Sequence, residues 1–145
     1  MSIFVDTGVF YAHHDRSSPR HDAAAAAMRE LLVGTYGKAF TSDYVFDETV
    51  TLTLSRTSRV EAARKAGERI RGAGEYPDVV SMLFVSSDCF ERAVAAFDRF
   101  DDHALSFTDA TTVALVEDRD IDAVLSFDDD FDGLVERVDP TTLAE

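Results

Sequence analysis

The stretch Ile3-Phe4-Val5-Asp6 sets the pattern for the whole chain, because a short apolar run ends at a single acid. Continuous apolar runs of this kind are typical of strands that are buried on both faces of a sheet. Similar short runs follow at 38–41, 79–85 and 123–126, and an edge strand is expected at 135–138. Segments with helical character separate them. This alternation predicts a three-layer α/β/α sandwich around a mostly parallel sheet of four to five strands.

Helices are expected where polar capping residues precede apolar or alanine-rich segments. The clearest is 20–33, which contains five consecutive alanines. A second helix is expected over 43–54. Ser58 is expected to open a basic helix, and Thr108 to cap a helix over 109–118. Because neither an internal repeat nor a linker divides the chain, we expect a single domain over residues 1–145.

The composition limits the possible classes of protein. The 145 residues include 46% apolar residues, enough for a hydrophobic core. The single cysteine, Cys89, rules out an intrachain disulfide. No apolar run approaches the length of a membrane span, and the N-terminus lacks the basic region of a secretion signal. We therefore expect a cytoplasmic protein without a membrane segment.

The chain is strongly acidic, with 28 Asp and Glu against 14 Lys and Arg and a net charge of −14. Of these acids 19 are Asp, and only two of the bases are Lys. An Asp-rich, Lys-poor surface favours adaptation to high salt, which screens self-repulsion, although an ordinary acidic cytosolic protein is the alternative. A generally basic nucleic-acid footprint is absent. Any nucleic-acid chemistry would need metal ions between two negative partners.

The bases are concentrated in residues 56–71, which hold six bases and only two acids. The six are Arg56, Arg59, Arg64, Lys65, Arg69 and Arg71. One interpretation is a solvated helix face with ion pairs between successive turns. The other is a local patch that attracts the phosphates of a nucleic acid.

Two acids directly follow predicted strands. Asp6 ends the first apolar run, and Asp128 comes two residues after the run Val124-Leu125-Ser126. In open α/β sheets, ligands bind beyond the carboxyl ends of the strands, which is where both acids are expected. The alternatives are structural, namely a helix cap for Asp6 and an Asx turn for Asp128.

Glu48 is placed where an acid is unfavourable. On the helix over 43–54, Val45, Glu48 and Leu52 share the face that points to the core, whereas Asp47 lies on the polar face. A carboxylate on an apolar face is costly unless it is paired or bound to a cation. Because no base comes within reach before Arg56, we favour Glu48 over Asp47 as the functional acid.

Asp109 opens a helix and could serve only to complement the helix dipole there. It could equally face Asp6 across the edge of the sheet. Several carboxylates in one crevice repel each other and stay ionised together only with divalent cations between them. Ligation by oxygen alone selects Mg²⁺ or Mn²⁺ and disfavours zinc. Such sites support metal-assisted phosphoryl transfer.

Four segments, in this order, resemble the motifs of the PIN-domain family, and most of all VapC-type toxin ribonucleases. They are Asp6-Thr7-Gly8, residues 42–49 around Glu48, residues 106–110 around Asp109, and residues 126–131 around Asp128. The resemblance covers nearly the whole chain. It implies that Asp6, Glu48, Asp109 and Asp128 form an acidic quartet. Asp6 and Asp109 would bind Mg²⁺ or Mn²⁺ directly, and Glu48 and Asp128 directly or through water.

The resemblance implies supporting hydroxyls from Thr7 and Ser126. It also implies cleavage of single-stranded RNA by a metal-activated water, which leaves a 5′-phosphate and a 3′-hydroxyl. The implied partners are the RNA substrate, a second copy of the chain in a homodimer, and an antitoxin protein. The helical segment 43–71 would be the face for RNA and antitoxin. A non-catalytic PIN-like interaction module and another metal-dependent phosphodiesterase, for housekeeping RNA processing or DNA cleavage, remain the alternatives.

Overall fold

In the described part of the chain, the centre of the molecule is a five-stranded sheet in which all paired strands run parallel. A computed structural model describes residues 1–143, so the last two residues of the expected domain, 144–145, lie outside the described part. The strands are β1 (Ser2–Val5), β2 (Lys38–Ser42), β3 (Ser81–Leu83), β4 (Ala123–Leu125) and β5 (Arg137–Val138), in the spatial order β3-β2-β1-β4-β5. The predicted class and strand number are confirmed.

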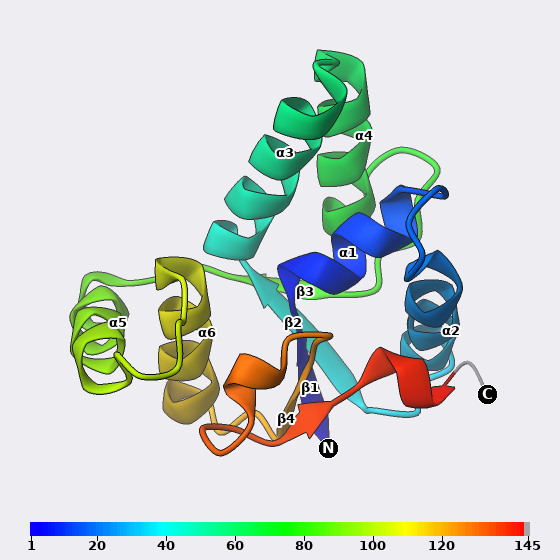
Figure 1. The fold of residues 1–145 in the computed structure, drawn as a ribbon. Helices are drawn as coiled ribbons and strands as arrows, with labels where there is room; N and C mark the ends of the chain where they lie inside the picture. Colours follow the sequence, from blue (N-terminus) through cyan, green and yellow to red (C-terminus); the bar gives the residue numbers. More distant parts are fainter. Residues whose placement is uncertain (144–145) are drawn as a thin grey trace.

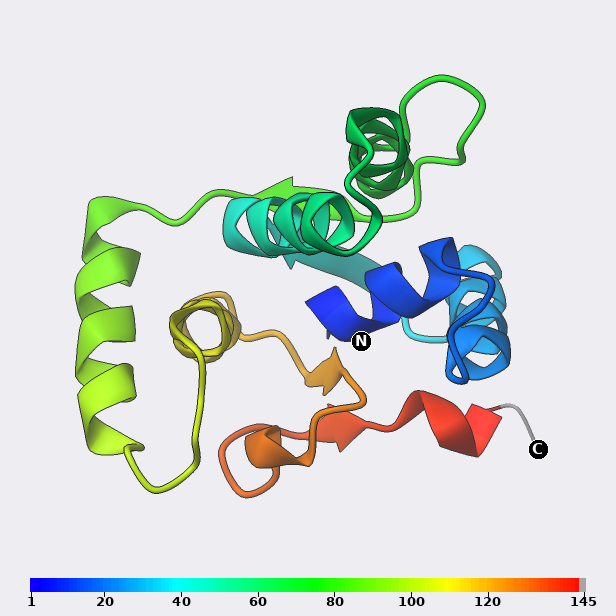
Figure 2. The same cartoon turned by 45° about the horizontal axis from the view of Figure 1, so that its top comes forward.

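Within residues 1–143, six α-helices surround the sheet. They are α1 (Thr7–His14), α2 (His21–Leu32), α3 (Asp43–Thr57), α4 (Val60–Arg71), α5 (Ser87–Arg99) and α6 (Phe107–Asp118), with short 3₁₀ helices at Asp129–Phe131 and Pro140–Leu143. The α5–α6 pair lies on one side of the sheet and α1 and α2 on the other (Figures 1 and 2). The α3–α4 hairpin stands away from the strands (Figure 1). Among these helices, none is long and apolar enough to cross a bilayer.

Several helix boundaries differ from the expectations. Ser58 does not open the basic helix, because its left-handed backbone (φ 56°) ends α3, and Arg59 takes the N-cap position of α4. Thr108 does not cap α6. The N-cap position belongs to Ser106, whose hydroxyl accepts the backbone N–H of Asp109. The third strand is shorter than the run 79–85, since only Ser81–Leu83 pairs with β2.

The strand order determines where a ligand can bind. The chain runs from β1 to β2 on one side, and β4 later pairs with the other side of β1. Such a reversal of the strand order leaves a crevice beyond the carboxyl ends of β1 and β4. The core strands are fully buried around it, with Phe4, Val5 and Val124 completely covered. Residues that follow β1 and β4 therefore meet at this crevice.

Candidate active site

A pocket of about 620 Å³ opens beyond the carboxyl ends of β1 and β4. All four acids of the predicted quartet line it, each from a different element. The lining residues are Asp6, Thr7, Gly8, Arg20, Glu48, Leu52, Ala104, Ser106, Asp109, Phe127, Asp128 and Asp129. The structure therefore brings the four acids to one place, whereas their chemical roles stay a prediction.

Asp6 occupies the N-cap position of α1 without capping it. Its side chain makes no capping hydrogen bond. Instead, the Ser126 hydroxyl donates to Oδ2 of Asp6 at 2.7 Å. The other oxygen, Oδ1, is buried without a hydrogen-bond partner, and so is Oγ1 of the neighbouring Thr7. Because buried polar atoms are nearly always paired, two unpartnered oxygens on neighbouring residues favour a ligand-binding role for Asp6 over a structural cap.

Asp109 has a structural bond as well as a place in the pocket. Its carboxylate accepts the backbone N–H of Ser106 at 3.1 Å, which completes a capping box at the start of α6. The side chain is therefore fixed in direction. The residue is buried, and it lines the pocket.

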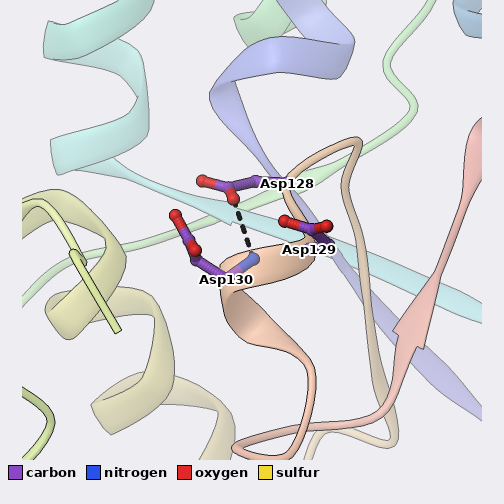
Figure 3. Close-up of side chains that lie close together, drawn as sticks. All are labelled: Asp128, Asp129 and Asp130. Atoms are coloured by element: carbon purple, nitrogen blue, oxygen red, sulfur yellow. Dashed lines mark hydrogen bonds between the residues drawn. The ribbon is translucent and has the colours of Figure 1, made fainter. Parts of the chain in front are cut away.

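Asp128 forms an Asx turn, the structural role that the sequence offered as an alternative for this residue. Its Oδ1 accepts the backbone N–H of Asp130 at 2.9 Å (Figure 3). Its own N–H donates to the Ser126 hydroxyl at 3.0 Å. In residues 1–143, the acids whose carboxylate oxygens lie within 4.8 Å of one another are Asp128, Asp129 and Asp130, not the quartet. The quartet surrounds a wider space.

Glu48 lies in the second turn of α3 and lines the pocket, whereas Asp47 is exposed and accepts a hydrogen bond from Thr51. The helical face chosen from the sequence is therefore the one that reaches the other acids. Within the described residues, Glu48 forms no hydrogen bond or ion pair. Leu52 continues the same face into the pocket wall.

The proximity of the acids alters their ionisation. Burial, and then the charge of Asp109, raises the pKa of Asp6 from 3.8 to about 7, although the Ser126 hydrogen bond opposes the rise. Burial, together with the charges of Asp128 and Glu48, raises the pKa of Asp109 to about 6 against the hydrogen bonds from Ser106. The crevice therefore disfavours several negative charges at once, as expected of carboxylates without a counter-ion.

The donor set fits a hard divalent cation. Every polar side chain of the quartet and its hydroxyl neighbours offers oxygen, and no histidine or cysteine lines the pocket within residues 1–143. Oxygen donors suit Mg²⁺ and Mn²⁺. The unpartnered Oδ1 of Asp6 and Oγ1 of Thr7 supply free lone pairs where such an ion would bind.

The six bases of segment 56–71 lie outside the pocket. Arg56 is one turn beyond Leu52 on α3, and its guanidinium stacks 4.7 Å from the ring centre of Tyr11. Arg69 donates to Nδ1 of His14 at 3.3 Å and stacks on Tyr76. The remaining four, Arg59, Arg64, Lys65 and Arg71, are exposed, and Lys65 pairs with Glu61 at 3.7 Å. The segment thus combines solvated bases with two arginines held by packing.

The sequence reasoning missed Arg20 and Phe127 as pocket residues. The guanidinium of Arg20 lies 4.9 Å from the ring centre of Phe127. Phe127 could have been found from its position between Ser126 and Asp128. No local signal marks Arg20, which follows a polar loop and Pro19. Only the packing of α2 beside the sheet brings it to the acids.

A second pocket of about 630 Å³ lies between α3, α4 and β3. Its walls include Phe46, Met82 and the exposed Phe84. It contains none of the buried, unpartnered oxygens found near Asp6. Although the two pockets are nearly equal in volume, the unpartnered oxygens make the acidic pocket the candidate active site.

Comparison with known proteins agrees with this geometry. The family model described as the PIN domain matches residues 3–136. The chain therefore belongs to the PIN-domain family. Within that family, it is 32% identical over 129 residues to the 23S rRNA-specific endonuclease VapC20 of Mycobacterium tuberculosis, which covers 89% of this chain and 91% of the relative. It is also 23% identical to a VapC ribonuclease of Archaeoglobus fulgidus, over 90% of this chain and 80% of that protein.

Solved structures share the fold. The crystal structure of Mycobacterium tuberculosis VapC20, described as a sarcin–ricin-loop-cleaving toxin, superposes with a TM-score of 0.73 at 32% identity and covers 89% of this chain and 92% of that chain. VapBC2 of Rickettsia felis, at 8% identity, has a TM-score of 0.68 over 95% of this chain and 98% of that chain. At that identity the likeness concerns the fold alone.

Proposed function

We propose that this protein is a Mg²⁺- or Mn²⁺-dependent endoribonuclease that acts as the toxin of a toxin–antitoxin pair. The observation that carries the proposal is the buried, unpartnered Oδ1 of Asp6 beside Thr7, in a pocket lined by three further predicted acids. A buried carboxylate without a partner is energetically costly, and a pocket that only binds protein gains nothing from it. The VapC relatives of similar length, named as ribonucleases, support the same activity.

In this proposal Asp6 and Asp109 bind the metal directly, and Glu48 and Asp128 bind it directly or through water. When bound, the ion would lower the pKa of a water molecule and neutralise charge on the phosphate. The chain's own residues provide the orientation. Ser126 holds Oδ2 of Asp6 and leaves Oδ1 without a protein partner, and the capping box fixes Asp109. The neighbouring Thr7 adds a second buried, unpartnered oxygen.

The proposed substrate is RNA, cut in single-stranded or looped regions to leave a 5′-phosphate and a 3′-hydroxyl. Ribosomal RNA is the first candidate, because the 32% identical relative is named as 23S rRNA-specific. The proposed partners are an antitoxin, since that relative is called a toxin, and a second copy of the chain. With a net charge of −14, the protein depends on local cations for affinity to the RNA backbone.

The test is incubation of the pure protein with ribosomal RNA, a sarcin–ricin-loop hairpin and an unstructured oligonucleotide. Each is combined with Mg²⁺, Mn²⁺ or a chelator, and matched single-stranded DNA serves as a control. We expect cleavage at defined positions of at least one RNA, which depends on the metal and is absent with the chelator. Cleavage of DNA alone would contradict the proposed substrate, and no cleavage of any strand would contradict a nuclease.

A further inference from the structure

Arg20 is the single basic side chain that lines the acidic pocket within residues 1–143. It lies in the loop before α2, at the N-cap position of that helix, and is exposed. Five acids share the pocket with it, namely Asp6, Glu48, Asp109, Asp128 and Asp129. Despite these neighbours, the guanidinium forms no ion pair within 4.0 Å and donates no hydrogen bond in the described chain. No direct ion pair with an acid therefore holds Arg20 in place.

Phe127 sets that position instead. The guanidinium carbon lies 4.9 Å from the centre of the Phe127 ring, within the range of a cation–π contact. Phe127 follows Ser126, which donates to Asp6, and precedes Asp128. The ring also lies near Gly8, since a Cβ added at Gly8 would lie 3.8 Å from Cδ2 of Phe127. The stack thus ties Arg20 to the two chain segments that carry Asp6 and Asp128.

This arrangement leaves the arginine ready for an anion. Stacking uses the flat face of a guanidinium, whereas its N–H donors lie around the edge. Five such donors without protein partners match the two free oxygens of a phosphodiester. In a pocket whose five carboxylates repel RNA, this cation adds a local attraction for the strand.

We propose that Arg20, held against Phe127, binds an RNA phosphate at the rim of the acidic pocket, next to the phosphate that is cleaved. This inference rests on the proposed ribonuclease function and adds a substrate-positioning residue to it. Arg20 lies outside the basic segment 56–71, so the strand has an anchor on the α2 side of the pocket as well as any contact on the α3–α4 side.

The test measures binding of a fluorescein-labelled unstructured RNA oligonucleotide by fluorescence anisotropy in Mg²⁺, at a series of salt concentrations. All variants carry Glu48→Gln to suppress cleavage. We expect Arg20→Gln to weaken binding about tenfold and to lower the slope of log affinity against log salt by about 0.7, the value for one phosphate contact in a single strand. Arg20→Lys should keep the slope but bind about two- to fivefold more weakly than arginine.

Two further variants separate charge from stacking. Phe127→Leu should weaken binding about two- to fivefold without changing the slope, because the cation stays but is no longer held. Arg16→Gln is the matched control, since it removes the same charge from the same exposed loop outside the pocket, and it should leave affinity and slope unchanged.

Equal affinity and slope for Arg20→Gln and Arg16→Gln would overturn the inference. Weaker binding of Arg20→Gln with an unchanged slope would also overturn it, because the arginine would then act only on the fold. Metal-dependent RNA cleavage by the unaltered protein is measured separately. If that cleavage occurs, the ribonuclease proposal stands whatever Arg20 does. If it does not, both proposals fail.

Discussion

The hydroxyl of Ser126 donates to Oδ2 of Asp6 at 2.7 Å and accepts the backbone N–H of Asp128 at 3.0 Å. One side chain thus links two acids that are more than 100 positions apart in sequence. The bond occupies one oxygen of Asp6 and leaves the other, Oδ1, buried and unpartnered. Ser126 therefore decides which oxygen of Asp6 is left without a partner.

Ser126→Ala should weaken Mg²⁺ binding about tenfold, because partners behind a metal ligand typically contribute that much or more. The lost hydroxyl frees Asp6 to rotate and also leaves the N–H of Asp128 without its acceptor. Isothermal titration with Mg²⁺ measures the effect. Ser87→Ala, at an exposed serine at the start of α5, is the control. Unchanged affinity in Ser126→Ala would show that Ser126 does not orient Asp6.

Asp6→Asn should abolish metal-dependent RNA cleavage and yet stabilise the metal-free fold. The amide removes a buried charge that repels Asp109, and its oxygen can still accept from Ser126. We expect the free energy of unfolding near pH 8 to rise by about 1–3 kcal/mol. Urea unfolding and a cleavage assay measure the two effects. Asp98→Asn removes an exposed charge and should change neither. Full cleavage by Asp6→Asn would remove Asp6 from the mechanism.

The metal-free protein should lose stability as the pH rises from about 4 to about 7. The folded-state pKa of Asp6 is about 7 and that of Asp109 about 6, both above the ordinary value of 3.8. Across this window the folded state holds more protons than the unfolded state, so the free energy of unfolding falls as pH increases. Millimolar Mg²⁺ should restore stability at the upper end. Unfolding curves across pH measure this, and a slope that Asp6→Asn leaves unaltered would contradict it.

Glu48→Gln should reduce cleavage strongly, by about 100-fold or more if Glu48 contributes to transition-state stabilisation. Asp47→Asn should be nearly silent, because Asp47 is exposed and bonded to Thr51 on the outer face of α3. The two substitutions remove the same charge from adjacent positions, so they form a matched pair. Single-turnover cleavage rates compare them. The opposite order would refute the assignment of the helical face.

Arg64→Glu should weaken RNA binding and make it less dependent on salt if the basic segment attracts the strand. Arg64 is exposed and free to meet a ligand, unlike Arg69, which is engaged by His14 and Tyr76. Arg69→Glu should therefore lower the melting temperature as well as any affinity for RNA. Anisotropy and thermal unfolding distinguish the two effects. Unchanged binding in Arg64→Glu would identify the segment as a solvated helix face.

The local features of the site could be predicted because they depend on short-range rules. An apolar run that ends at Asp6 marks the carboxyl end of a strand, and the i, i+3, i+7 spacing around Glu48 marks the inner face of a helix. Both features hold in the structure. The N-cap of α6 was harder to predict, since Ser106 and Thr108 are both acceptable capping residues. Only the backbone geometry selects Ser106.

The alternation of strands and helices, the acidic composition and the positions at which strands end in an acid could all be read from the order of residues. The hold of Ser126 on Asp6, the unpartnered Oδ1 and the contact of Arg20 with Phe127 beside the acids appear only in the folded chain. Periodicity and propensity act over a few residues, whereas these contacts join segments from α2, β1 and β4 that meet only when the parallel sheet assembles.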